Sequence, residues 1–408
     1  MNPLTMNVKK NIDDLAALGG APLFDEPIHV GRPNLPEREA LLRRINEALD
    51  RRWLTNKGPL VLELEKRIAD YLGVKHCIAV CNGTIALEIV IKALELKGEV
   101  ICPSFTFVAT AHALEWLGLR PVFCDIDPQT HNIDPAQAQQ LITGKTSGIV
   151  GVHLWGRPCA IEDLTRLAKE HRLKLFFDAA HAFGVTAGGR RIGGFGEAEV
   201  FSFHATKVFH TFEGGAITTN NDALAARCRL LKNFGFKGYD RVLCSGTNGK
   251  MSEIHAAMGL GMMDSIADIM EKNKKYYRIY QKIFEGAGLR LLSYAEGARN
   301  NFQYIVVEIG EGTTALTRDQ LADLLGAENI LARRYFYPGC HRMEPYVSDT
   351  TIDRARLKQT EKIGERTLCL PTGTSLSEED VEEIGRLLVF IVKNDRSIAA
   401  KLSATTTG

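Results

Sequence analysis

The chain has 408 residues, 45% of them hydrophobic and 24% charged, a composition typical of a globular protein with a large core. Its 50 Lys and Arg residues are nearly balanced by 49 Asp and Glu residues, so it offers no basic field to hold nucleic acid or an anionic membrane. The sequence has no run with the character of a signal peptide or a membrane span, and its nine cysteines are scattered, so we expect reduced thiols, no metal site and a cytoplasmic location.

The length predicts more than one domain. Gly19, Gly20 and Pro22 interrupt any regular element near the start, so we expect the first residues to form a loosely tethered arm. The last residues are of low complexity and are expected to be disordered. The expected parts are an arm over 1–30, a large domain over 31–268, a small C-terminal domain over 269–400 and a disordered tail over 401–408.

Short apolar runs alternate with segments of helical periodicity from His76 onward. This alternation predicts an α/β domain with a mainly parallel sheet covered by helices on both faces. Ligands of such sheets bind at the carboxyl ends of the strands. The expected strands are 77–80, 100–102, 122–124, 148–153, 173–177, 201–204 and 216–219. The expected helices are 37–50, 60–72, 84–96, 108–117, 135–142, 161–171 and 222–232.

After residue 244 the regular alternation of strands and helices ends. A polar loop over 244–250 leads into a helix that starts at Ser252, and a charged helix over 269–285 is expected to bridge to the second domain. An expected strand over 304–309 and helices over 317–327 and 377–392 then suggest a small α+β unit.

Gly83 and Thr84 stand between a strand and a helix start, in the run Cys-Asn-Gly-Thr. Free amides and the positive end of the helix dipole make such a position a possible phosphate cradle, and glycine allows close approach of the backbone. The alternative is an ordinary N-cap. The glycine spacings of a Walker loop or a dinucleotide fingerprint are missing.

Two further strand ends carry residues suited to a flat heterocycle. Phe107 follows one strand and could stack on a ring, although phenylalanine more often packs in a core. Asp178 ends the most apolar strand, and a buried carboxylate is costly unless it meets a cation such as a protonated pyridine nitrogen. The alternative for Asp178 is a cap on the next turn.

Lys207 follows the alternating run Phe-Ser-Phe-His in an otherwise apolar neighbourhood. Burial disfavours the ammonium form, and a neutral amine forms Schiff bases with aldehydes such as pyridoxal phosphate. The alternative is a lysine that extends its charged end into solvent. Each signal is weak alone, but together they predict a phosphate cradle, a ring platform, a carboxylate and an amine at successive strand ends.

The run Ser-Phe-His-Ala-Thr-Lys before Glu213-Gly214-Gly215, together with Asp178-Ala-Ala-His181 and the loop 246–253, resembles the sugar-nucleotide aminotransferases. These form a branch of the fold type I enzymes that use pyridoxal 5'-phosphate (PLP), and the resemblance extends from about Arg32 to Leu388. It implies a mainly parallel, seven-stranded mixed sheet with helices on both faces, a smaller α+β domain and a homodimer with shared active sites.

The resemblance also implies a role for each matching residue. Lys207 would be the Schiff-base lysine, Asp178 would pair with the pyridine nitrogen, and Phe107 would stack on the ring. The remaining assignments are phosphate binding by Gly83, Thr84 and Ser202, contact with the neighbouring subunit's cofactor phosphate by Asn248, a place beside the ring hydroxyl for His181, and substrate contacts by Lys250 and His341.

The implied activity is amino transfer from glutamate to the C4 keto group of a dTDP-4-keto-6-deoxyhexose. The runs 150–159 and 338–341 and the histidine at position 181 favour C4. The open alternatives are C3 chemistry, a UDP- or GDP-linked sugar, and a non-catalytic regulator with the same fold. The intact Asp178 and Lys207 argue against the last of these.

Overall fold

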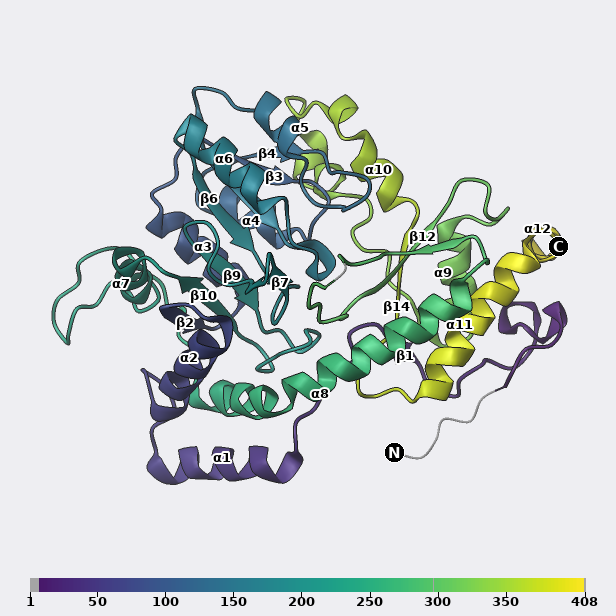
Figure 1. Cartoon of the computed structure of the whole chain (residues 1–408), viewed down its shortest axis with the longest axis horizontal. Helices are drawn as coiled ribbons and strands as arrows, with labels where there is room; N and C mark the ends of the chain where they lie inside the picture. The colour runs from purple at the N-terminus through teal and green to yellow at the C-terminus, as the bar shows by residue number, and fades with distance from the viewer. Residues whose placement is uncertain (1–6, 296, 407–408) are drawn as a thin grey trace.

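The computed structural model describes residues 7–295 and 297–406, and its larger part is built around one seven-stranded sheet (Figure 1). The strand order is β2-β10-β9-β6-β5-β3-β4; β10 is antiparallel to both neighbours and the other pairs are parallel. The predicted mixed, mainly parallel sheet is therefore confirmed. Its strands are β2 (His76–Val80), β3 (Glu99–Pro103), β4 (Arg120–Cys124), β5 (Thr146–Val152), β6 (Lys174–Asp178), β9 (Glu199–Ser202) and β10 (Gly215–Thr219).

Helices cover both faces of this sheet because its strands carry apolar side chains on both sides. Val150 and Phe176 point to the face covered by α3 (Gly83–Ala93), α4 (Ala109–Trp116) and α7 (Asp222–Leu231). Their neighbours Ile149 and Phe177 point to the opposite face, in the cluster with α6. The helices of that second face are α2 (Pro59–Leu72), α5 (Pro135–Gln140), α6 (Ile161–His171) and the first half of α8 (Glu253–Phe284).

The two helices expected after Ser252 are one continuous helix, α8, which runs along the molecule between its two parts (Figure 1). Residues 256–270 of α8 pack into the core of the large part, and Tyr276, Tyr280 and Phe284 pack into the core of the small part. The expected boundary at residue 269 therefore lies inside a helix that serves both cores. The small part contains an antiparallel sheet of β11 (Leu289–Leu291), β12 (Ile305–Ile309) and β14 (Thr367–Leu370), with α9 (Arg318–Ala327) and α11 (Glu378–Lys393).

The N-terminal arm is not loosely tethered where the structure describes it. Leu15, Leu23 and Phe24 are buried in the core of the small part. The Glu328 carboxylate accepts hydrogen bonds from the amides of Ala16 (2.8 Å) and Leu23 (2.7 Å). β1 (Ile28–His29) also pairs in parallel with β13 (Ile330–Leu331). Contacts with residues about 300 positions away thus fix a segment in which Gly19, Gly20 and Pro22 prevent a longer helix.

The expected disordered tail is also corrected in part. Residues 401–406 continue the helix α12 (Asp395–Thr406), and residues 407–408 lie outside the described part of the chain. The other elements are α1 (Arg38–Arg51), α10 (Lys358–Gly364), the hairpin of β7 (Thr186–Ala187) and β8 (Arg190–Arg191), and short 3-10 turns at Ile12–Asp14, Ala16–Leu18, Leu154–Gly156, Cys340–Arg342, Tyr346–Ser348 and Arg354–Arg356.

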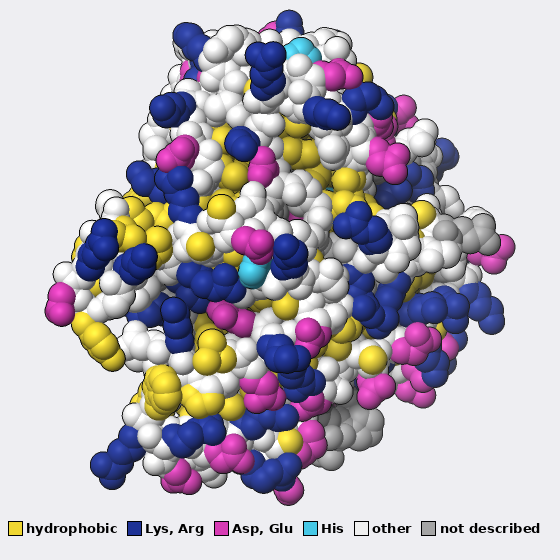
Figure 2. Space-filling view, turned by 60° about the vertical axis from the view of Figure 1, so that its left-hand side comes forward, with side chains coloured by type: hydrophobic (Ala, Val, Ile, Leu, Met, Phe, Trp, Pro, Cys, Tyr) yellow, Lys and Arg dark blue, Asp and Glu magenta, His cyan; other side chains and the backbone are white. Residues whose placement is uncertain are grey.

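The surface is consistent with the balanced charge of the sequence. Figure 2 shows Lys and Arg side chains interspersed with Asp and Glu on the same face. All nine cysteines, each within the described residues, are free thiols. Among the helices described, none has both the length and the apolar character that crossing a bilayer requires.

Candidate active site

Lys207 lies in the turn that connects β9 to β10. Phe203 is fully buried, and its amide donates to Gly214 O, while the amide of Lys207 donates to His204 O. The lysine side chain is partly buried. Its surroundings lower the pKa of the amine to about 8, because desolvation disfavours the ammonium and the nearby Asp178 carboxylate only partly offsets this effect. The shift has the direction that the sequence predicted.

Asp178 ends β6, between β5 and β9, and is almost completely buried. Its carboxylate accepts hydrogen bonds from the amide of Ala180 (3.0 Å) and from Thr110 Oγ1 (2.9 Å). Burial raises the pKa of this carboxyl, against the effect of both hydrogen bonds and of Lys207. Asp178 therefore caps the next turn, which was the alternative to a role at a ring nitrogen. Its carboxylate is also buried, so a nearby cation would stabilise its charged form.

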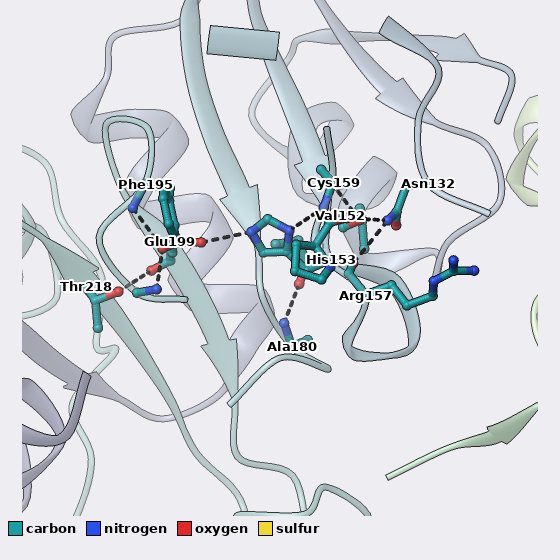
Figure 3. Close-up of polar contacts among 12 residues, drawn as sticks. Asn132, Val152, His153, Arg157, Cys159, Ala180, Phe195, Glu199 and Thr218 are labelled. Atoms are coloured by element: carbon teal, nitrogen blue, oxygen red, sulfur yellow. Dashed lines mark hydrogen bonds and ion pairs between the residues drawn. The ribbon is translucent and has the colours of Figure 1, made fainter. Parts of the chain in front are cut away.

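A buried polar network lies behind the end of β6 (Figure 3). His153 Nε2 and Glu199 Oε1 are 2.9 Å apart, and both side chains are fully buried. His153 Nδ1 accepts from the amide of Cys159 (3.0 Å), so the ring proton is on Nε2 and is donated to Glu199. The His153 ring stacks on Phe177, and its amide donates to Asp178 O. This network fixes the strand end that carries Asp178.

His181 is connected to Lys207 through Tyr304, a residue that no sequence motif marks as functional. Tyr304, which directly precedes β12, places its hydroxyl 3.4 Å from Lys207 Nζ and 3.2 Å from His181 Nε2. His181 Nδ1 in turn accepts from the amide of Trp155 (3.3 Å). The one sequence signal for Tyr304 is the polar run Asn-Asn-Phe-Gln before a strand, which alone has no specific meaning.

Gly83, Thr84 and Ser202 come together at the start of α3. A Cβ atom at Gly83 would lie 2.9 Å from Ser202 Cβ, so only glycine allows this approach of α3 to β9. Asn82 caps the helix, since its Oδ1 accepts from the amide of Ile85 (2.8 Å). The N-cap alternative is therefore true, and the first-turn amides at Gly83 and Thr84 still have no partner within the helix. A helix N-terminus beside a serine hydroxyl suits a phosphate.

Phe107 is not a core residue. Its side chain is 59% exposed, and it lies in the loop before α4, three residues ahead of the Thr110 that holds Asp178. An exposed ring at this sheet edge is free to cover a flat ligand.

His341 is buried between two segments of the chain. Its side chain is fully buried, 2.7 Å from Ser104 Oγ and 3.2 Å from Glu361 Oε1. Burial lowers its pKa despite Glu361. His341 thus connects the loop after β3 to α10, and its hydrogen-bonding atoms are taken up there, so the substrate contact expected of it finds no support.

Asn248 and Lys250 lie together, apart from Lys207. Lys250 Nζ donates to Asn248 Oδ1 (2.5 Å) and lies over the Phe234 ring at 4.7 Å. No hydrogen bond, ion pair or ring contact joins either of them to Lys207, Asp178 or His181 in the described part of the chain.

The fold and this site together define a class of protein. An amine with a lowered pKa, a buried carboxylate and a helix N-terminus with a close glycine stand at neighbouring strand ends of one sheet. They suit an aldehyde, a protonated ring nitrogen and a phosphate, which are the three features of PLP. The arrangement is that of a PLP-dependent enzyme of fold type I.

The chain belongs to the DegT/DnrJ/EryC1/StrS aminotransferase family, whose pattern matches residues 36–389. It is 38% identical over 362 residues to dTDP-4-amino-4,6-dideoxy-D-glucose transaminase of Shigella dysenteriae, covering 88% of this chain and 98% of that protein. It is 37% identical to GDP-perosamine synthase of Caulobacter vibrioides, covering 88% and 96%. The crystal structure of DesI in the presence of its TDP-sugar product has a TM-score of 0.92 at 46% identity, covering 96% of this chain and all of that one.

The family defines the chemistry. Its aminotransferases are PLP-dependent, so this chain is a PLP-dependent sugar transaminase. The predicted family, fold and cofactor are confirmed.

Proposed function

We propose that this enzyme transfers an amino group from L-glutamate to the C4 keto group of a dTDP-4-keto-6-deoxyhexose, giving dTDP-4-amino-4,6-dideoxyglucose. The observation that carries the proposal is the likeness to DesI with its TDP-sugar product, which covers 96% of the chain. The site residues support amino transfer in general. The choice of sugar rests on the relatives.

The residues proposed to hold the cofactor are those gathered at the strand ends. Gly83, Thr84 and Ser202 would bind the phosphate, since they bring a helix N-terminus and a hydroxyl together. Asp178 would pair with the ring nitrogen, and Phe107 would cover the ring. His181 would lie beside the ring hydroxyl.

PLP supplies an electrophilic carbon for the donor amine and a ring that withdraws electrons. Lys207 is proposed to form the covalent link to the cofactor and, once released, to carry a proton as a neutral amine. Its pKa of about 8 suits both roles, because a base works best when its pKa is near the working pH. Asp178 keeps negative charge at the ring nitrogen, and Thr110 and Ala180 fix its orientation.

A second candidate is the same transfer on a GDP-linked sugar, favoured by the similarity to a GDP-perosamine synthase at 37% identity. Two further candidate activities are amino transfer to C3 of the sugar and amino transfer to a UDP-linked sugar. All of them use the same Lys207 chemistry and differ in the substrate contacts.

A panel of nucleotide keto-sugars separates these candidates. Purified enzyme with glutamate is offered dTDP-4-keto-, dTDP-3-keto-, GDP-4-keto- and UDP-4-keto-6-deoxyhexoses, and each product is identified by NMR. We expect the highest kcat/KM for the dTDP-4-keto sugar, with the new C–N bond at C4. Preference for the GDP sugar, or amination at C3, would reject the proposal in favour of the corresponding alternative.

We further propose that the enzyme is a cytoplasmic homodimer in which Asn248 and Lys250 reach the partner's site. Exposed apolar side chains near this loop would then be covered by the second copy, because monomers rarely expose such groups together. They include Phe234, Phe236, Tyr239, Val242 and Leu243. Sedimentation should give a dimer, and Asn248→Ala should weaken PLP binding although Asn248 does not contact Lys207 in its own chain.

The pH dependence of PLP uptake follows from the lowered pKa of Lys207. The ammonium is not a nucleophile, so uptake by the cofactor-free protein should rise with pH until the amine is neutral and level off above about pH 8. An ordinary lysine, with a pKa of about 10.4, would give a rate that keeps rising well beyond this point. Stopped-flow absorbance measures the rate, and a profile that still climbs tenfold per unit above about pH 9 would contradict the assigned environment.

A further inference from the structure

A short segment of the small part, residues 300–304, extends across the site and is almost completely buried. Asn300 Nδ2 donates to Gly156 O (2.5 Å), and Asn301 Nδ2 donates to His181 O (2.9 Å) and Phe183 O (3.1 Å). The next two polar residues, Gln303 and Tyr304, point to the turn that carries Lys207. We call residues 300–304 the strap.

The strap holds the Lys207 turn from one side. Gln303 Oε1 accepts from the amide of Val208 (2.9 Å), the residue directly after Lys207. Tyr304 OH lies 3.4 Å from Lys207 Nζ itself. Both contacts come from outside the sheet domain, so the position of the amine depends on the small part as well as on β9.

The hydrogen bonds around Tyr304 have a definite polarity. The Trp155 amide donates to His181 Nδ1, so the neutral imidazole carries its proton on Nε2. His181 Nε2–H then donates to the Tyr304 oxygen, 3.2 Å away. In the 3.4 Å contact with Lys207, Nζ donates to the Tyr304 oxygen, as an ammonium must. When the amine is neutral, this contact can reverse, because the phenolic proton is not used by His181 and Nζ then has a lone pair to accept it. An ammonium has only donors and cannot accept this proton.

The titratable groups described around Lys207 are few. Asp178 faces it from β6, His181 from the turn after β6, and Tyr304 from the strap. Burial lowers the pKa of His181 well below its ordinary value, so this ring stays neutral, and burial raises that of Tyr304, so the phenol keeps its proton. Asp178 is the one carboxyl group of this set, and its carboxylate form favours the ammonium of Lys207.

We propose that Tyr304 is a further catalytic residue, whose hydroxyl donates a hydrogen bond to the released Lys207 amine and so holds it neutral and oriented for proton transfer. The inference rests on the proposed role of Lys207. Under this proposal, a residue of the small part contacts the reacting amine. His181 and the Trp155 amide fix the direction of the hydrogen bond between Tyr304 OH and Lys207 Nζ.

Tyr304→Phe removes the hydroxyl and keeps the ring, so it tests this role with little change in packing. The matched control is Tyr277→Phe, which removes a buried hydroxyl of the same small part whose hydrogen bond goes to Leu292 O (3.1 Å), away from Lys207. For the wild type and both variants, the rate of PLP uptake by the cofactor-free, full-length protein is measured against pH. PLP's own titration is common to all three proteins and cancels in the comparison.

We expect Tyr304→Phe to raise the midpoint of this profile by about one unit, the effect of losing one buried hydrogen bond to the neutral amine. We also expect kcat of the holoenzyme to fall by about tenfold or more, with a smaller change in KM. Tyr277→Phe should leave the midpoint unchanged. An unchanged midpoint in Tyr304→Phe, or equal shifts in both variants, would overturn the proposal.

Borohydride reduction and peptide mapping of the wild-type holoenzyme keep the two proposals apart. Cofactor on Lys207 with no midpoint shift in Tyr304→Phe would reject the role of Tyr304 alone. Cofactor on another residue would reject the role of Lys207, and that of Tyr304 with it. Thermal unfolding of both variants checks that neither has lost its fold.

Discussion

Replacing Lys207 with alanine is expected to lower the single-turnover rate of amino transfer by at least about 10²–10⁴-fold, the usual contribution of a positioned general acid–base group. The lysine would also be lost as the covalent anchor of the cofactor, so the measured loss should lie toward the upper end or beyond. The Lys207→Ala variant keeps Asp178 and the proposed phosphate site, and it should still bind PLP without a covalent link.

Ser202→Ala is the matched control for this variant. It removes one hydroxyl from the proposed phosphate site and leaves the amine in place, so it should weaken PLP affinity by about tenfold or less. At saturating cofactor its single-turnover rate should stay close to that of the wild type. If Lys207→Ala kept a rate within tenfold of Ser202→Ala under these conditions, Lys207 would not be the proton carrier.

Most of the sheet and its strand-end residues could be predicted because they depend on local patterns. Each apolar run before Asn82, Asp178 and Lys207 forms a strand within two residues of the expected bounds. The alternation of Phe201 and Phe203 with Ser202 and His204 also holds, since both phenylalanines are buried and His204 is exposed. Parallel strands then bring their carboxyl ends to one edge, so residues distant in sequence could be expected near one another.

What could not be predicted depends on contacts between distant segments. The arm looked unstructured because nothing local shows that Glu328 binds its amides. Tyr304 reaches Lys207 from 97 residues away, and no periodicity marks such a contact. The burial of His341 and the contacts of its ring nitrogens with Ser104 and Glu361 likewise could not be read from the sequence. Burial of a polar side chain is decided by its partners, which a single sequence does not reveal.

Glu199→Ala is expected to be the most destabilising change near the site, lowering the free energy of unfolding by about 3–5 kcal/mol, as for other buried polar pairs from which one partner is removed. The carboxylate accepts from His153 Nε2 and from the amides of Gly193 and Phe195 (Figure 3). All three donors would be left without this acceptor inside the protein. An unsatisfied buried donor costs about 1–3 kcal/mol, so three of them at the low end of this range would account for the expected loss, with water satisfying part of the rest.

Glu197→Ala supplies the comparison two residues away. The Glu197 carboxylate pairs with Lys174 Nζ at 2.9 Å, and both side chains are partly exposed to solvent, so the loss of this pair should cost about 1 kcal/mol or less. Denaturant unfolding of both variants, at equal protein concentration and without cofactor, measures the difference. His153 and Glu199 lie next to the end of β6 and help to fix the position of Asp178. Glu199→Ala should therefore displace Asp178 and weaken PLP binding, whereas Glu197→Ala should not. Equal unfolding free energies for the two variants would mean that the His153–Glu199 pair does not brace the site.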